Sequence, residues 1–268
     1  MIRVVCAQVA PEIGDLRHNA AMSAAAVSSA AADGADLIVL PELVTSGYLF
    51  SSTDEARAAA LDPGSPLLAA WGRAAGDAVV VGGFCEAGED SAVYNSAAVV
   101  DRSGVLAVYR KTHLWDAERT VFSPGTAAPP VLDTRAGRIG VLICYDMEFP
   151  EMTRGLALAG ADLLAVPTNW PLVPRPSGER PPEVVTAMAA ARANRVYLAC
   201  CDRTGTERGQ AWTEGTAIVD PDGWVVASAG PGVASALASC DLGAARRKTI
   251  SAVNHVLADR RTDVYDQF

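Results

Sequence analysis

Three reactive side chains each follow an apolar run of the kind that forms buried strands. Glu42, Lys111 and Cys144 stand directly after the runs LIVLP, VLAVYR and IGVLI. A cysteine thiolate can attack a carbonyl carbon, a carboxylate can take the thiol proton, and an ammonium group can stabilise the thiolate and the later oxyanion. Taken singly, each residue has an ordinary structural explanation, as a buried cysteine, a capping or salt-bridged glutamate and a solvated lysine. Together they form a complete set for nucleophilic acyl transfer.

The residues around Cys144 predict a buried strand, a sharp turn and a helix. Residues 138–144 are mostly apolar, polar residues follow at once, and Pro150 opens an Ala/Leu-rich run. In an open α/β sheet, ligands bind at the carboxyl ends of the strands, and backbone N–H groups at a helix start favour a thiolate. We therefore expect Cys144 at a strand end, in a position suited to a nucleophile.

The first half of the chain alternates between strand and helix patterns. Strands are expected over residues 2–9, 35–40 and 78–84. Helices are expected over residues 18–32 and 66–75. Residues 94–100 and 105–111 predict a hairpin, because Asp101-Arg-Ser-Gly104 between them has turn chemistry. Glu42 and Lys111 then lie just past the ends of strands.

Three segments of the second half repeat segments of the first half in the same order. Residues 138–144, 160–167 and 216–223 correspond to residues 3–9, 34–41 and 97–104. Because the strands are continuous apolar runs, each repeat must bury its sheet on both faces. The sequence therefore predicts an α/β fold, a four-layer α-β-β-α sandwich with an internal pseudo-twofold repeat. In that arrangement Glu42 and Cys144 face one cleft.

Length and composition indicate a single domain over residues 1–268. Its last part, about residues 254–268, has several charges and two aromatic residues, and we expect a tail that packs on the outside, on another subunit. No segment is suited to span a bilayer, and the short apolar start is unlike a secretory signal, so we expect a cytoplasmic protein. Its six cysteines are accordingly expected to be reduced.

The charge distribution argues against several classes of partner. The formal net charge is -9, and the one basic cluster is Arg246-Arg247-Lys248, which argues against nucleic acid. The three histidines are widely separated, which argues against a His-rich metal site. A small molecule is the expected partner.

Three ordered segments contain the reactive residues. They are Pro41-Glu42, Tyr109-Arg-Lys-Thr-His-Leu114 and Cys144-Tyr-Asp-Met-Glu-Phe-Pro-Glu151. In order and spacing they resemble the signature segments of the nitrilase superfamily, the carbon-nitrogen hydrolases. Further matches are Phe122-Ser-Pro-Gly125, Pro167-Thr-Asn-Trp170, Arg192-Ala-Asn-Arg195 and Asp259–Tyr265. The resemblance covers essentially the whole chain, and the family's αββα sandwich agrees with the repeat.

The resemblance implies a Glu-Lys-Cys triad that needs no metal or organic cofactor. Glu42 would act as general base and acid, Lys111 as oxyanion stabiliser and Cys144 as nucleophile. The backbone N–H of Tyr145 would complete the oxyanion hole. A second glutamate of many members falls on Glu118, where it would position Lys111 and the substrate amide. The resemblance also favours a homodimer or a larger homo-oligomer.

The residues after the cysteine favour the amidase and carbamoylase branch of the superfamily. Nitrile-hydrolysing members usually have Cys-Trp-Glu, whereas this chain has Cys144-Tyr145-Asp146. We therefore expect hydrolysis of a small linear amide to a carboxylate and ammonia through a cysteine thioester. The alternatives are an N-carbamoyl amine or amino-acid amidohydrolase, a nitrile hydrolase with the same triad, and a non-catalytic ligand-binding member.

The residues that line the pocket are expected at further strand ends. Tyr48, Asn169 and Trp170 follow strands on the same side and are expected to bind substrate. His113 is expected to order its loop rather than to transfer protons. One segment departs from the family pattern, because Trp212-Thr-Glu-Gly-Thr216 stands where the family has Phe-x-Gly-x-Ser. Because the glycine is shifted, the resemblance does not extend to the details of the pocket or the loop at that point.

Overall fold

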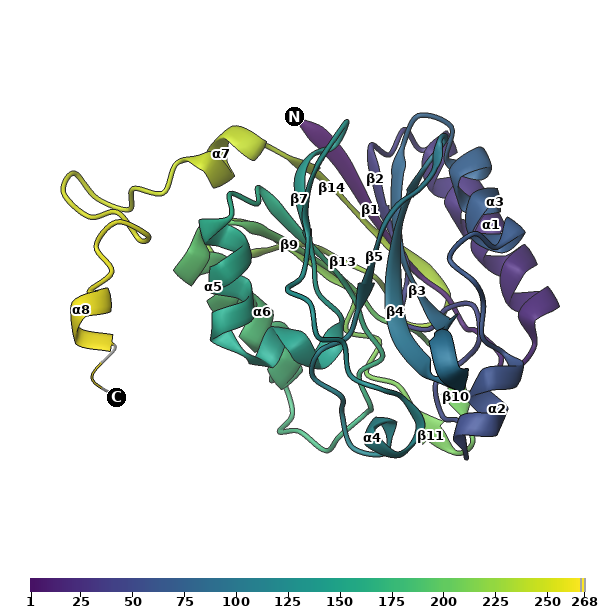
Figure 1. Cartoon of the computed structure of the whole chain (residues 1–268). Coiled ribbons are helices and arrows are strands. Elements are labelled where there is room, and N and C mark those ends of the chain that lie inside the picture. Colours follow the sequence, from purple (N-terminus) through teal and green to yellow (C-terminus); the bar gives the residue numbers. More distant parts are fainter. Residues whose placement is uncertain (266, 268) are drawn as a thin grey trace.

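Two six-stranded β-sheets form the centre of the computed structural model, which describes residues 1–265 and 267 (Figure 1). The first sheet has the order β14 (Ala234–Cys240), β1 (Ile2–Gln8), β2 (Leu37–Val39), β3 (Val79–Ala87), β4 (Val93–Asp101), β5 (Gly104–Arg110). The second has the order β6 (Val131–Thr134), β7 (Gly137–Val141), β8 (Leu163–Pro167), β9 (Tyr197–Cys201), β12 (Ala217–Val219), β13 (Val225–Ser228). The short strands β10 (Thr206–Glu207) and β11 (Gln210–Ala211) pair with each other.

The two sheets have the same succession of strand directions. In each, three parallel strands stand at the centre, β1, β2 and β3 in the first sheet and β7, β8 and β9 in the second. Two antiparallel strands follow on one side, and one antiparallel strand closes the other side. The three matched sequence segments fall on the equivalent pairs β7 and β1, β8 and β2, and β12 and β4. The predicted internal repeat is therefore confirmed.

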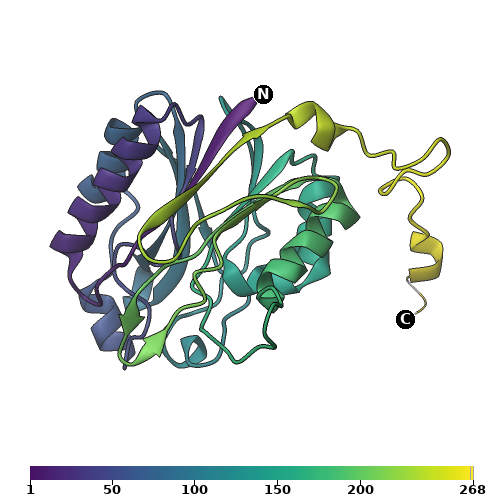
Figure 2. The ribbon, with the colours of Figure 1, turned by 180° about the vertical axis from the view of Figure 1, so that it is seen from behind.

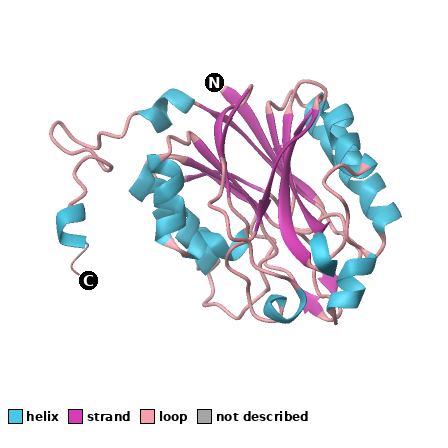
Figure 3. Cartoon of the chain, in the orientation of Figure 1, coloured by secondary structure: helices cyan, strands magenta, loops and turns pink. Residues whose placement is uncertain are grey.

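Helices cover the outer face of each sheet, which gives four layers (Figures 1 and 3). The helices α1 (Leu16–Ala32) and α3 (Pro66–Ala75) lie on the first sheet, and α5 (Pro150–Leu158) and α6 (Pro182–Asn194) lie on the second. The sequence marks these helix starts. The side chains of Asp15 and Ser65 cap α1 and α3, and proline stands in the first turn of α3, α5 and α6. The predicted α-β-β-α sandwich is the arrangement observed.

Alternate residues of the central strands pack on opposite faces. On β1, Val4 and Cys6 belong to the apolar core between the two sheets, whereas Val5 and Ala7 pack toward the helices. Residues of both sheets, among them Val39 and Ile139, share the inter-sheet core. Since each face meets an apolar layer, the strands need no polar face, and this explains their continuous apolar sequence.

Loops and short elements gather at one end of the sheets (Figures 1 and 2). These elements include α2 (Thr53–Ala58), α4 (Glu118–Val121), β10 and β11. A 3-10 turn, η1 (Glu89–Ser91), joins β3 to β4, and a second, η2 (Cys144–Glu148), precedes α5. The loops at this end carry the residues that were predicted to react.

The predicted strand over residues 138–144 is too long at its end. The strand β7 ends at Val141, and Cys144 is instead the first residue of η2. A local hydrogen bond ends the strand early. The Asp146 carboxylate accepts the backbone N–H of Ile143 at 3.2 Å, and this contact closes a turn. Cys144 therefore stands on a turn beyond the sheet rather than at its last position.

The C-terminal segment leaves the two sheets after α7 (Leu242–Arg246) and ends near α8 (Thr262–Tyr265), as Figures 1 and 2 show. Of the predicted tail, residues 254–265 and 267 are described, and most of them are exposed. One contact with the body is a hydrogen bond of 3.0 Å from the Arg154 guanidinium to the Val256 carbonyl. The packing of this tail on another subunit stays a prediction.

Within residues 1–265 and 267, no helix combines the length and the apolar character needed to cross a bilayer. All six cysteines are free and buried, as expected for reduced thiols.

Candidate active site

A buried cluster of charges lies at the loop end of the first sheet. The Lys111 ammonium group donates to Glu42 Oε1 at 2.6 Å and to the Glu118 carboxylate at 2.8 and 2.9 Å. Lys111 and Glu42 are fully buried, and Glu118 is 4% exposed. An ammonium group between two carboxylates offsets the cost of removing all three charges from water. The structure therefore brings together three of the four residues predicted to be catalytic.

Asn95 on β4 joins the same cluster, and it was missed in the sequence. Its Nδ2 donates to Glu42 Oε1 at 2.7 Å and to Glu118 Oε1 at 3.0 Å. The available signal was an amide side chain in a largely apolar strand. Glu42 Oε2, in contrast, is buried and has no partner among the described residues. One oxygen of Glu42 is thus fixed by Lys111 and Asn95, while the other is free to take a proton.

Close backbone packing fixes the position of Glu42. A Cβ atom at Gly83 would lie 2.5 Å from Glu42 Cα, so only glycine allows β3 to approach this closely. The backbone N–H of Glu42 donates to the Thr168 carbonyl at 3.3 Å, and Asn169 Nδ2 donates to the Glu42 carbonyl at 2.8 Å. Thr168 follows Pro167 as Glu42 follows Pro41, so the two repeats meet at equivalent positions.

Asp146 holds the turn that carries Cys144 against the loop after β5. Its carboxylate accepts the Ile143 N–H at 3.2 Å, the Tyr109 hydroxyl at 2.9 Å and the His113 N–H at 3.0 Å. The His113 ring also contacts Asp146 at 2.9 Å and stacks on Phe149 at 3.7 Å. These contacts fit the loop-ordering role predicted for His113. Asp146 itself was missed, although it stands inside the quoted signature.

Cys144 occupies a strained backbone conformation. Its φ of +46° lies in the left-handed region, which residues with a Cβ atom rarely adopt. Strain of this kind persists where surrounding contacts over-determine it, and it is common at functional sites. The contacts of Asp146 supply that constraint here. The residue as a whole is 6% exposed and lines a cavity, so it is neither sealed under apolar packing nor freely solvated.

The charges of the cluster act on Cys144. Burial and the Glu42 carboxylate raise the pKa of the thiol well above its usual value, while Lys111 and a hydrogen bond from the Asn169 backbone oppose the shift. Burial likewise raises the pKa of Glu42 to about 7, against the lowering effect of Lys111. Burial would lower the pKa of Lys111, but the carboxylates of Glu118 and Glu42 outweigh it and raise that pKa. The thiol therefore holds its proton more strongly than an ordinary cysteine does, and a carboxyl group with a pKa of about 7 acts on it.

Cys144 opens into a cavity of about 370 Å³ between the loop end of the second sheet and the start of α6. Asn169 and Trp170, both predicted to bind substrate, line this cavity beside Cys144 and Tyr145. The remaining lining residues are Trp115, Glu148, Pro171, Pro182, Glu183 and Thr186. Tyr145 directly follows the nucleophile, and the oxyanion role of its backbone N–H stays a prediction. The volume suits a small ligand.

Tyr48 lies in an adjoining space rather than in the Cys144 cavity. It lines a smaller cavity of about 100 Å³ that also contains Glu118. Burial raises the pKa of its phenol, and so do the nearby Glu118 and Glu42 carboxylates. The ring contacts Trp212 edge to face, with centroids 5.5 Å apart. Tyr48 is thus placed to support Glu118, and its predicted contact with substrate stays a prediction.

The segment that departs from the family pattern supports the wall of the cavity from behind. A Cβ atom at Gly215 would lie 2.8 Å from the Trp170 indole, so the shifted glycine makes room for that ring. The buried Asp202 carboxylate accepts the backbone N–H groups of Trp170 at 3.0 Å and Gly215 at 2.9 Å. The glycine that is shifted relative to the family pattern therefore leaves space for the Trp170 ring in the cavity wall.

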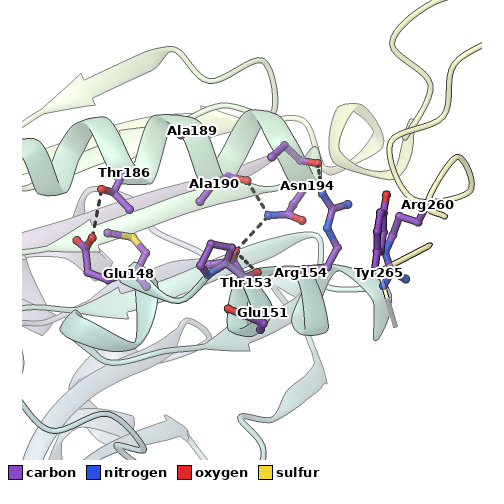
Figure 4. Close-up of a pocket in the computed structure, with 13 residues that line it drawn as sticks. Glu148, Glu151, Thr153, Arg154, Thr186, Ala189, Ala190, Asn194, Arg260 and Tyr265 are labelled. Atoms are coloured by element: carbon purple, nitrogen blue, oxygen red, sulfur yellow. Dashed lines mark hydrogen bonds between the residues drawn. The ribbon is translucent and has the colours of Figure 1, made fainter. Parts of the chain in front are cut away.

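A larger groove of about 540 Å³ lies outside the reactive cluster, between α5, α6 and the C-terminal segment (Figure 4). Arg154, Asn194, Arg260 and Tyr265 contribute to its walls, whereas Glu42, Lys111 and Cys144 do not. It shares Glu148 and Thr186 with the Cys144 cavity, and their side chains contact each other at 3.5 Å (Figure 4). Across the described residues, no group of three or more His, Cys, Asp and Glu side chains is arranged to hold a metal ion.

Comparison with known proteins defines the class. The Carbon-nitrogen hydrolase family profile matches residues 3–248. The chain is 34% identical over 272 residues to a nitrilase of Pyrococcus abyssi, with 99% of both chains covered. It is also 34% identical over 230 residues to an (R)-stereoselective amidase of Pseudomonas sp., with 85% of this chain and 81% of that protein covered. The chain therefore belongs to the carbon-nitrogen hydrolase family of the nitrilase superfamily, as its motifs predict.

A solved structure supports the same conclusion. The amidase of Nesterenkonia sp. AN1 has a TM-score of 0.83 with this chain at 26% identity, covering 100% of this chain and 99% of that one. In the structure of a variant of that amidase, acrylamide has undergone Michael addition at the active-site cysteine. The chain described here is accordingly an enzyme of the carbon-nitrogen hydrolase class.

Proposed function

We propose that this protein hydrolyses a small linear amide to a carboxylate and ammonia through a thioester on Cys144. The observation that carries the proposal is the buried Glu42–Lys111–Glu118 cluster, whose charges act on a cysteine that opens into a cavity. Hydrolysis of an amide needs a nucleophile, a group that moves a proton and a positive site for the oxyanion. Cys144 and this cluster together supply all three.

In the first half-reaction, Cys144 attacks the amide carbonyl carbon. Its thiol proton passes to Glu42 Oε2, the oxygen without a partner. The tetrahedral oxyanion rests on the Lys111 ammonium group and on the Tyr145 backbone N–H. Glu42 then gives its proton to the amide nitrogen, the C–N bond breaks, ammonia leaves and the acyl group stays on sulfur.

In the second half-reaction, water attacks the thioester carbonyl carbon. Glu42 takes a proton from that water and returns it to the departing sulfur, so the carboxylic acid leaves and the thiol is restored. Lys111 keeps its proton throughout, because the carboxylates of Glu118 and Glu42 hold its pKa well above the ordinary value. Glu118 and Asn95 keep the ammonium group and Glu42 in place between the two steps.

The experiment that tests this function compares matched amides and nitriles. Butanamide and butanenitrile differ only in the group that the thiolate attacks, so the same pocket serves both. We expect ammonia and butanoate from the amide with a kcat/KM at least about tenfold above that for the nitrile. A preference for the nitrile would overturn the choice of branch, and no turnover of any amide, carbamoyl compound or nitrile would favour the ligand-binding alternative.

The pH dependence of amide hydrolysis follows from Glu42. Burial raises the pKa of Glu42 to about 7, and the carboxylate must be ionised to accept the thiol proton. We therefore expect kcat/KM for an uncharged amide to fall below about pH 7, approaching tenfold per pH unit. A pH-rate profile with butanamide measures this limb. A profile that stays flat down to pH 5 would mean that Glu42 is not the base.

A carbamoyl substrate remains the second candidate, since ureido and amide carbonyls present the same reacting atoms to Cys144. Ammonia release from a panel of N-carbamoyl amines and N-carbamoyl amino acids, compared with amides of equal length, separates the two. A homo-oligomeric state, a cytoplasmic location and the lack of a nucleic-acid partner stay predictions.

A further inference from the structure

The cavity around Cys144 presents hydrogen-bond acceptors beyond the catalytic cluster. Its ten described lining residues include two carboxylates, Glu148 and Glu183, and no lysine, arginine or histidine. Glu183 stands in the first turn of α6, and Glu148 ends the turn η2. The cavity therefore has a negative wall within reach of the nucleophile.

Two of these acceptors have no partner among the described residues. Glu183 Oε2 and Asn169 Oδ1 are both buried without a hydrogen bond. Asn169 is only 1% exposed and lines the cavity, and while its Nδ2 donates to the Glu42 carbonyl, its oxygen is left without a partner. Glu148 has one weak contact, at 3.5 Å, with the Thr186 hydroxyl (Figure 4). Buried acceptors without partners are costly, so this site is built for a ligand that donates.

Aromatic rings complete the same cavity. Trp115, Tyr145 and Trp170 line it together with the two glutamates. The Trp115 and Tyr145 rings meet edge to face with centroids 4.8 Å apart, and Trp115 is 44% exposed at the mouth. Indole and phenol faces attract cations, and they attract them more strongly where water is partly excluded.

We propose that the amide substrate carries a second, positively charged nitrogen, an ammonium or guanidinium group, which binds Glu148 and Glu183 against the aromatic rings. This inference rests on the proposed function and names its substrate class, a cationic amino amide. Asn169 Oδ1 would accept an N–H from the substrate's own amide group.

The electrostatics favour a cation over the alternatives. Burial and the nearby Glu183 carboxylate raise the pKa of Glu148, so a cation between the two would relieve their repulsion. A substrate carboxylate in that place would meet two negative groups and no cationic side chain of the lining. A neutral alkyl group would leave both carboxylates partly desolvated without a partner.

Matched substrate pairs test this selectivity. In each pair, the cationic member carries an ammonium group where the neutral member has a methyl group. The pairs are 3-aminopropanamide with butanamide, 4-aminobutanamide with pentanamide, and 5-aminopentanamide with hexanamide. For at least one pair we expect kcat/KM to be higher for the cationic member by about tenfold or more, and succinamate to be the poorest substrate. Equal or better turnover of the neutral members at all three lengths would overturn the inference.

Variants assign the selectivity to the two glutamates. In Glu183→Gln and Glu148→Gln, which keep size and hydrogen bonding, the ratio of cationic to neutral kcat/KM is expected to fall by about fivefold or more. Glu151→Gln is the matched control, because Glu151 lines the outer groove and not the Cys144 cavity. The control should leave the ratio unchanged. A ratio that falls equally in all three variants would indicate an effect of net charge alone.

A second readout does not depend on turnover and separates this inference from the proposed function. Cys144 is labelled with 2-aminoethyl or 2-sulfonatoethyl methanethiosulfonate, each of which forms a disulfide with the thiolate and releases methanesulfinate. Mass spectrometry follows the rate, and Cys144→Ala corrects for the other cysteines. We expect the cationic reagent to be preferred, and the preference to fall at least about fivefold in the Glu148→Gln/Glu183→Gln double variant. If no amide is hydrolysed, the proposed function fails, and an unchanged labelling preference would overturn the cationic pocket separately.

Discussion

Replacing Cys144 with alanine is expected to reduce ammonia release by at least about ten-thousand-fold, to the level of the uncatalysed reaction in the assay. The reason is that no thioester can form without the sulfur atom. Folding should change little, because the substitution removes one atom from a side chain that borders a cavity. Steady-state ammonia release and urea unfolding measure the two effects on one preparation.

Two variants make this result specific. Cys144→Ser keeps the size and the turn but offers a poorer nucleophile at neutral pH, so it should also lose nearly all turnover. Cys85→Ala is the control, since Cys85 is also buried but lies on β3 outside the Cys144 cavity. Substantial turnover by Cys144→Ala, with Cys85→Ala unaffected, would exclude the thioester.

Replacing Lys111 with methionine is expected to damage both catalysis and stability. It removes the oxyanion-stabilising ammonium group, which by itself is worth about a hundred- to a thousand-fold in kcat. It also leaves Glu42 and Glu118 buried side by side without their shared cation. Breaking a buried ion cluster in this way costs about 3 to 5 kcal/mol of unfolding free energy. Single-turnover kinetics and urea unfolding at several pH values measure the two losses.

The pH dependence of the stability that Lys111→Met loses distinguishes an effect of charge from an effect of packing. Beside Lys111 the pKa of Glu42 is already about 7, and it rises further once the cation that lowers it is removed. The destabilisation relative to the unsubstituted protein should therefore be smallest well below pH 7 and grow as the pH rises past it. The double variant Lys111→Met/Glu118→Gln removes one of the unpaired charges, so it should regain part of the stability but no activity. A stability loss that does not vary with pH would mean that Lys111 acts through packing alone.

Much of the fold could be predicted, because its signals are local or repeated. Two equivalent units are specified by the continuous apolar strands and by the matched pairs of segments. The helix starts are marked by proline and by Asp or Ser capping residues. Glu42 and Lys111 could be placed together because each follows a strand that ends at the same edge, whereas the place of Glu118 came from the family resemblance. The position of Cys144 was less accurate, since the side chain of Asp146 ends the strand early, and that depends on a hydrogen bond that apolar patterning does not reveal.

The residues that support the site could not be predicted, since they depend on contacts between distant segments. Asn95 reaches Glu42 and Glu118 through the position of β4 in the sheet. Glu183 reaches the Cys144 cavity only because α6 begins beside η2. Tyr48 was expected to line the substrate pocket, but it lines the smaller adjoining cavity together with Glu118, and its ring contacts Trp212. Sequence patterns locate strand ends, but they do not set the paths of the loops beyond them.

The most direct test looks for the acyl group on the sulfur atom. The enzyme is mixed with butanamide, quenched in acid during steady-state turnover and digested, and the peptide that contains Cys144 is weighed by mass spectrometry. A butanoyl group on Cys144, present only while ammonia is being released, is the expected result. Sustained ammonia release while this peptide stays unmodified would contradict catalysis by the Glu42, Lys111 and Cys144 side chains acting together.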